Sequence, residues 1–158
     1  MQLGMIGLGK MGANMTTRLM RGGHDLVVYD RSAEAVQTAS DDGARGASSV
    51  ADLVGQLAAP RAVWVMVPSG SPTEETVESL AELLSPGDAV VDGGNSNYKE
   101  SVRRGESLKN RGLHFVDVGT SGGVWGLEEG YSLMIGGAEE AVERLRPMFE
   151  TLAPAADA

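Results

Sequence analysis

Residues 3–12 have the sequence LGMIGLGKMG, in which a short apolar run leads directly into three glycines spaced G-x-G-x-x-G. The apolar run predicts a buried strand, and the recurrence of Met11, Met15 and Leu19 predicts the helix that follows. Asp30 closes the next apolar run along the chain. A strand, a glycine-rich turn, a helix and an acidic residue in this order are the context in which the motif indicates a dinucleotide site.

The glycine motif would bind a ligand through its backbone. Gly7 permits a tight turn, Gly9 lets the main chain approach a pyrophosphate, and Gly12 lets helix and strand pack closely. Free N–H groups at the helix N-terminus attract phosphate charge. The alternative is a glycine-rich turn that binds nothing. We predict cofactor contacts from the whole motif, Gly7, Leu8, Gly9, Lys10, Met11 and Gly12.

Asp30 bears on which nicotinamide dinucleotide binds. A carboxylate at the end of the second strand accepts hydrogen bonds from ribose hydroxyls and repels a 2′-phosphate, which favours NAD over NADP. Arg31 leaves three interpretations open, because a guanidinium can bind a 2′-phosphate, stack on adenine or remain solvated. Since Asp30 directly precedes it, we favour stacking and expect NAD as the cofactor.

Outside the motif, apolar runs alternate with helical patterns, which is typical of an α/β fold. We predict a doubly wound Rossmann-type fold, with a mostly parallel sheet and helices on both faces, over residues 1–152. Residues 153–158 would be a tail or the start of a linker. Strands are expected at 3–6, 26–29, 62–67, 89–92, 113–118 and 132–135, and helices at 11–19, 33–41, from 49, from 71, at 98–110 and from 138.

Three details of the helices are also predicted. Ser49 and Asp52 resemble a capping box. Ser71 would cap the next helix, with Pro72 in its first turn. Pro147 would break or kink the last helix.

Two further strand ends are candidate ligand sites, because ligands of such sheets bind outside the carboxyl ends of the strands. One follows the strand at 62–67, and the other is the stretch Asp92–Asn97. Asn95 offers both an acceptor and donors to a cofactor ribose or a substrate. A turn residue in a glycine-rich loop is an equally good interpretation of Asn95.

Composition excludes several classes of function. The net charge of −9 argues against nucleic-acid binding, and the pair Arg103-Arg104 is best interpreted as a solvated helix face. There is no cysteine, and His24 and His114 are not spaced as metal ligands, so no metal site is expected. The chain contains no apolar run long enough for a membrane span and no recognisable signal peptide, which predicts a cytoplasmic protein.

Beyond these patterns, the sequence resembles the β-hydroxyacid dehydrogenases in GLGKMGANM, GGHDLVVYDRS and TSGGVWGLEEG. Within that group, DGGNSNYKES followed by FVDVGTSGGVWG resembles the 6-phosphogluconate dehydrogenases, in particular their shorter NAD-linked bacterial branch. The resemblance extends from Met1 to about Leu152. Hydroxyisobutyrate and tartronate semialdehyde dehydrogenases are the alternative within the group, against which DGGNSNYKES argues. A stand-alone NAD-binding module without catalysis is the alternative outside it.

The resemblance implies roles for particular residues. The glycine motif would hold the pyrophosphate, and Asp30, Arg31 and Ser32 the adenosine ribose. NADP-linked members have Asn at the position of Asp30, and many members have Lys at that of Pro68. Trp125 would wall the site or fill the core, and we favour the core. The implied cofactor cleft is lined by Val67, Pro68 and Ser69, Asn95 would touch cofactor and substrate, and the implied substrate residues are Ser121, Gly122 and Gly123.

The resemblance also implies a reaction, the oxidative decarboxylation of 6-phosphogluconate to ribulose 5-phosphate without a metal. Its catalytic lysine and glutamate belong to a following helical domain that also forms a homo-oligomer. The lysines of this chain, Lys10, Lys99 and Lys109, do not stand in that motif. We therefore assign no catalytic residue here, and expect a cofactor domain of a longer enzyme that is inactive alone.

Overall fold

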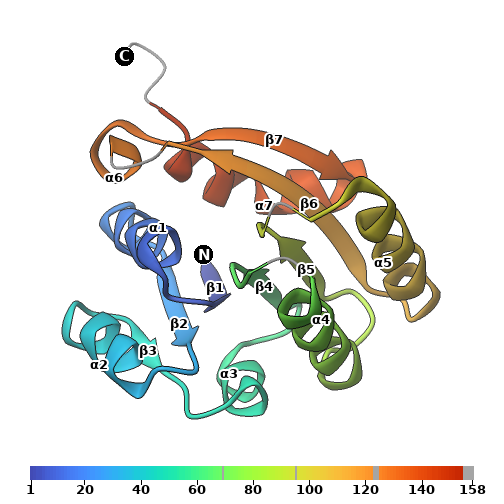
Figure 1. Cartoon of the computed structure of the whole chain (residues 1–158), viewed down its shortest axis with the longest axis horizontal. Coiled ribbons are helices and arrows are strands. Elements are labelled where there is room, and N and C mark those ends of the chain that lie inside the picture. The colour runs from blue at the N-terminus through green and yellow to red at the C-terminus, as the bar shows by residue number, and fades with distance from the viewer. Residues whose placement is uncertain (69, 95, 123–124, 155–158) are drawn as a thin grey trace.

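The computed structural model describes residues 1–68, 70–94, 96–122 and 125–154 (Figure 1). Within these residues, seven strands form one sheet in the order β3-β2-β1-β4-β5-β6-β7. The strands are β1 (Gln2–Ile6), β2 (Asp25–Tyr29), β3 (Arg45–Gly46), β4 (Ala62–Val65), β5 (Ala89–Asp92), β6 (His114–Ser121) and β7 (Ser132–Gly137). The helices are α1 (Lys10–Arg21), α2 (Ala33–Asp41), α3 (Val50–Gln56), α4 (Ser71–Leu83), α5 (Tyr98–Asn110), α6 (Gly126–Glu129) and α7 (Glu139–Leu152).

The strand order confirms the predicted fold class. Strands β1 to β6 pair in parallel, and β7 alone runs antiparallel, against β6. The order places β1 beside β4, so the chain reverses direction across the sheet at this pair. That is the switch point at which ligands bind in doubly wound sheets.

Alternating side chains of the strands pack on two separate cores. In β4, Trp64 joins the core formed with α1, α2 and α7, and Val63 and Val65 join the core formed with α3, α4 and α5. The indole of Trp64 meets the ring of Phe149 from α7 edge to face, with centroids 5.9 Å apart. Because β4 is buried on both faces, its sequence is a continuous apolar run, as is typical of a central parallel strand.

Two predicted helix details differ from the structure. Pro147 does not break the last helix, since α7 continues to Leu152. Leu145, Met148 and Phe149 flank the proline and are buried, so packing maintains the helix across it.

The start of α4 also differs from its prediction. Gly70, not Ser71, is the N-cap of α4, because the carbonyl of Gly70 already accepts from the amide of Glu74. The predicted capping box at α3 is confirmed in part, since the hydroxyl of Ser49 accepts from the amide of Asp52. None of the helices in the described ranges is both long and apolar enough to cross a membrane.

Candidate cofactor site

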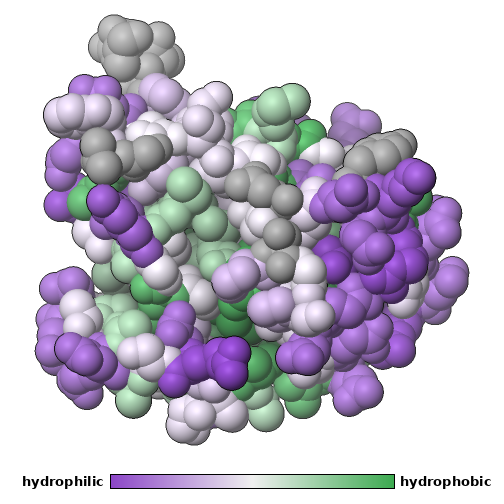
Figure 2. All heavy atoms as spheres, in the orientation of Figure 1, coloured by the Kyte–Doolittle hydropathy of each residue, from purple (hydrophilic) through white to green (hydrophobic). Residues whose placement is uncertain are grey.

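A cleft of about 800 Å³ opens at the carboxyl ends of β1, β2, β4 and β5. Its volume lies in the range of small-molecule and cofactor sites. In Figure 2, apolar side chains are exposed in the middle of the face shown, between strongly hydrophilic surfaces. The structure brings seven of the predicted cofactor residues to this one cleft, namely Gly7, Gly9, Met11, Asp30, Arg31, Val67 and Pro68.

Two glycines of the motif are required by the fold itself. Gly7 has φ +102°, which side chains rarely adopt, and a Cβ there would lie 2.5 Å from the carbonyl oxygen of Met66. A Cβ on Gly12 would collide with the carbonyl oxygen of Gly7. The first turn of α1 is therefore pressed against the end of β1.

Gly9 is different, because nothing in the protein requires it. Its φ of −62° suits any residue, and no protein atom lies within 4 Å of where its Cβ would be. Gly9 is also the N-cap of α1, no side chain caps the helix, and the first turn carries no acidic residue. The first turn of α1 thus stands at the cleft, where its N–H groups would offer an anionic ligand donors and room.

Asp30 braces the glycine turn as well as facing the cleft. Its Oδ2 accepts a hydrogen bond of 2.7 Å from the amide of Leu8, and its Oδ1 accepts one of 2.8 Å from the amide of Ser32. A carboxylate has about four lone-pair sites, so two remain for ribose hydroxyls. The side chain is half-buried, and its position between the turn and the cleft fits a dinucleotide.

Three other predicted cofactor residues, Leu8, Lys10 and Ser32, lie at the margin of the cleft or outside it. The side chain of Leu8 is buried in the core, and Lys10 is exposed at the start of α1. The hydroxyl of Ser32 accepts from the amide of Ala35 and caps α2. The amides of Leu8 and Ser32 both donate to Asp30, so these two residues support the glycine turn and do not line the cleft.

The loop after β5 forms the opposite side of the cleft. Gly93 donates from its amide to the carbonyl of Val65 at 2.9 Å, and a Cβ on Gly94 would lie 2.7 Å from the carbonyl oxygen of Val67. The glycines let this loop lie directly on the end of β4. Asp92 is fully buried, and its Oδ1 accepts from the amide of Gly94 at 3.0 Å.

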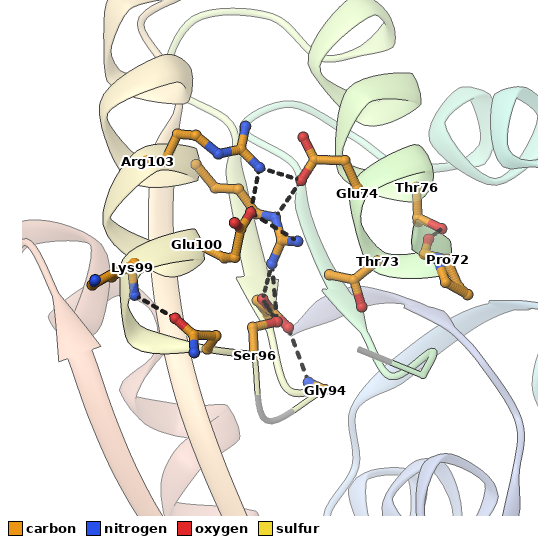
Figure 3. Close-up of polar contacts among 12 residues, drawn as sticks. Pro72, Thr73, Glu74, Thr76, Gly94, Ser96, Lys99, Glu100 and Arg103 are labelled. Carbon is orange, nitrogen blue, oxygen red and sulfur yellow. Dashed lines mark hydrogen bonds and ion pairs between the residues drawn. The ribbon is translucent and has the colours of Figure 1, made fainter. Parts of the chain in front are cut away.

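Arg104 lies behind that loop, which corrects the interpretation of the arginine pair. Arg103 is exposed as predicted, but Arg104 is 3% exposed and pairs with Glu74 of α4 and Asp92 of β5. Figure 3 shows Glu74, Glu100 and Arg103 converging between α4 and α5. Hydrogen bonds from Arg103 and Arg104 lower the pKa of the Glu74 carboxyl. A buried cation at this point has no local sequence pattern, because its partners come from other elements.

The predicted substrate segment lies at the end of β6, outside the lining of this cleft. Ser121 is exposed, and Gly122 packs on the ring of the buried Tyr131, where a Cβ would come within 2.7 Å. Gly126 approaches the same ring. Trp125 is 67% exposed, so its assignment to the core is wrong. Ser69, Asn95 and Gly123 lie outside the described residues.

Sequence reasoning missed part of the cleft lining. Glu75 and Thr76 come from the first turns of α4, and Tyr29 and Met66 from the ends of β2 and β4. For Tyr29 and Met66 the available signal was positional, because both stand at or near the carboxyl end of a predicted strand. Glu75 and Thr76 lie within α4 and had no such signal. Across the described ranges, no group of acidic or histidine side chains is arranged to hold a metal ion.

Comparison with known proteins agrees with this geometry. A family model described as the NAD binding domain of 6-phosphogluconate dehydrogenase matches residues 2–157. A decarboxylating, NAD(+)-dependent 6-phosphogluconate dehydrogenase from Haloferax volcanii is 47% identical over 157 residues, which are 99% of this chain and 52% of that protein.

Solved structures extend the comparison. A Plasmodium falciparum 6-phosphogluconate dehydrogenase, described with NADP+ as its cofactor and 6-phosphogluconate as its substrate, is 28% identical with a TM-score of 0.89, covering 99% of this chain and 35% of that one. The 3-hydroxyisobutyrate dehydrogenase of Mycobacterium tuberculosis is 25% identical with a TM-score of 0.88, covering 96% and 52%.

The chain therefore spans about half the length, or less, of these proteins. The family model, in contrast, covers nearly all of the chain and coincides with the strand order and the glycine turn described above. The chain belongs to the family of the NAD-binding domain of 6-phosphogluconate dehydrogenase.

Proposed function

We propose that this chain binds NAD in the cleft at the carboxyl ends of β1, β2, β4 and β5, as the cofactor domain of an enzyme that oxidatively decarboxylates 6-phosphogluconate. The observation that carries the proposal is Gly9, a glycine that the fold does not need, at an uncapped helix N-terminus facing the cleft. A side chain there would occupy the space of a bound pyrophosphate. We assign residues 1–152, up to the end of α7, to this domain.

The preference for NAD over NADP rests on Asp30. Its negative charge opposes a 2′-phosphate, while its unused lone pairs suit two ribose hydroxyls. Arg31 is exposed at the same end of the cleft and would stack on the adenine. The relatives described above include one named for NAD and one for NADP, so the local charge at Asp30 decides the proposal.

The substrate proposal rests on the family and on the stretch DGGNS at the end of β5. When bound, the cofactor would supply the hydride acceptor. Ser121, Gly122 and Gly123, together with Asn95, would bind the sugar acid near its reacting carbons. Lys10, Lys99 and Lys109 are all exposed, and none stands in the motif that carries the catalytic lysine of the family, so we expect no turnover by these residues alone. Structural similarity to a 3-hydroxyisobutyrate dehydrogenase makes a shorter hydroxy acid the second candidate.

Thermal-shift titration of the chain with NAD and NADP tests the proposal, because a ligand of the folded state raises Tm by mass action. NAD should raise Tm at lower concentration than NADP. Gly9→Val is the matched variant, since a Cβ at this position meets open space and the extended backbone of Gly9 suits any residue. The variant should fold, with at most a small loss of Tm from the poorer N-cap, and should abolish the shift. A Tm shift with NAD that survives Gly9→Val would contradict the proposed site. Equal shifts with NAD and NADP would contradict the preference.

A further inference from the structure

A buried ion network stands behind the wall of the cleft formed by β5 and α4. The guanidinium of Arg104 donates from Nε to Glu74 at 2.8 Å and from one terminal nitrogen to the hydroxyl of Ser96 at 3.0 Å. The same nitrogen lies 3.4 Å from the carboxylate of Asp92. That carboxylate in turn accepts from Ser96 at 2.6 Å and from the amide of Gly94 at 3.0 Å. One arginine thus joins α5, the first turn of α4 and the loop after β5.

Both parts that Arg104 joins also line the cleft. Gly94 belongs to the loop that forms one side, and Glu75, which directly follows Glu74 in α4, also lines the cleft. Arg104 itself does not reach the cleft, being 3% exposed and enclosed by α4 and α5. Figure 3 shows the side of the network with Glu74, Ser96 and Gly94.

Stability does not explain this arrangement well. Taking the Asp92 carboxylate and the Arg104 guanidinium out of water carries a desolvation cost that their attraction only partly offsets, and apolar side chains of similar volume often stabilise as much. The network instead fixes geometry, because a planar guanidinium holds its several partners in defined relative positions. The geometry is therefore suited to positioning.

The two sides of the cleft correspond to the two halves of a dinucleotide. Asp30 and the glycine turn face the adenosine and the pyrophosphate, so the second nucleoside falls on the side of β4 and β5. Gly94 and the start of α4 belong to that side.

We propose that Arg104 is a positioning residue for the nicotinamide nucleoside: it holds the loop after β5 and the first turn of α4 in register, without touching the ligand. This inference rests on the proposed binding of NAD. The proposed role applies to Arg104 and not to Arg103. Arg103 also pairs with Glu74, but it is exposed and makes no contact with Asp92 or Ser96 in the described structure.

Isothermal titration with two ligands tests this role. ADP carries the adenosine and the pyrophosphate of NAD but lacks the second nucleoside. Arg104→Lys should weaken NAD binding roughly tenfold, about the loss of one hydrogen bond to a charged group, and change ADP binding less than about twofold. Arg103→Lys, the matched control, should change neither affinity.

Ser96→Ala keeps the test valid if Arg104→Lys does not fold, because it removes only the hydroxyl between Asp92 and Arg104. It should weaken NAD binding in the same selective way, by a smaller factor. Equal loss of NAD and ADP affinity, or no loss in either variant, would overturn the positioning role. If the unaltered chain binds ADP but not NAD, the proposed function fails first, and the positioning role fails with it.

Discussion

Asp30 and Asp92 occupy equivalent places on the two sides of the cleft. They share one hydrogen-bond pattern but have different roles. Each stands at the carboxyl end of a strand, and each accepts from the backbone amide two residues later, Ser32 for Asp30 and Gly94 for Asp92. The second oxygen of Asp30 accepts from a backbone amide of the glycine turn. The second oxygen of Asp92 accepts from a serine hydroxyl and faces a buried arginine.

Burial accounts for the different roles. Asp30 is half-buried, has only neutral donors and keeps lone pairs toward the cleft, so it can recognise a ligand directly. Asp92 is fully buried, and its charge is balanced by Arg104, so it can only shape the loop. One local motif therefore serves recognition on the exposed side and architecture on the buried side.

The largest expected effect is on the buried side. Asp92→Asn keeps the shape of the side chain but removes the charge that balances Arg104, so we expect the free energy of unfolding to fall by about 3 kcal/mol. Urea denaturation followed by circular dichroism measures it. Asp30→Asn should lose less in the same assay, about 1.5 kcal/mol, because it removes one hydrogen bond from a backbone amide to a half-buried carboxylate. Equal losses in the two variants would break the comparison.

The second largest expected effect is on cofactor affinity, at Asp30 on the exposed side. Asp30→Asn removes the charge that opposes a 2′-phosphate and leaves one oxygen to serve two amides, so NAD affinity should fall about tenfold while NADP affinity is retained or rises. Titration calorimetry with both dinucleotides measures the change. Asp41→Asn, an exposed carboxylate of α2, serves as the charge control. A parallel loss of NADP affinity would mean that Asp30 acts only by bracing the turn.

The smallest effect concerns Asp117, the partner of Asp92 in the β5–β6 register. Burial, and then the charge of Asp92, raise the pKa of the Asp117 carboxyl. The protonated form is favoured by folding, so its contribution is complete below the ordinary carboxyl pKa and is lost as the pH rises through the raised pKa. Asp117→Asn should therefore raise Tm at pH 7, on the order of 1 °C, with the gain shrinking toward pH 4. A lower Tm of this variant at pH 7 would contradict the direction.

Local patterns made the fold predictable, but contacts distant in sequence decided much of the site. The strands and the glycine turn were found because periodicity and G-x-G-x-x-G are carried by adjacent residues. The strand β3 and the helix α6 are too short to show periodicity. The burial of Arg104 follows from how α5 packs beside α4 and β5, which no window along α5 contains. The prediction for Trp125 failed because it rested on the size and apolar character of the side chain alone. In the structure this side chain is 67% exposed.

The network around Arg104 also constrains how this wall of the cleft can change over evolutionary time. Its partners are side chains from three separate segments, so a substitution at Glu74, Asp92 or Ser96 alters the effect of a substitution at Arg104, and such changes are not additive. The partners of Asp30 are backbone amides, which persist through any substitution except proline. Apart from Gly7 and Gly12, which the fold requires, the residues around Asp30 can therefore be substituted one at a time. On the opposite side, the effects of substitutions in the Arg104 network depend on one another, so we expect its residues to change together.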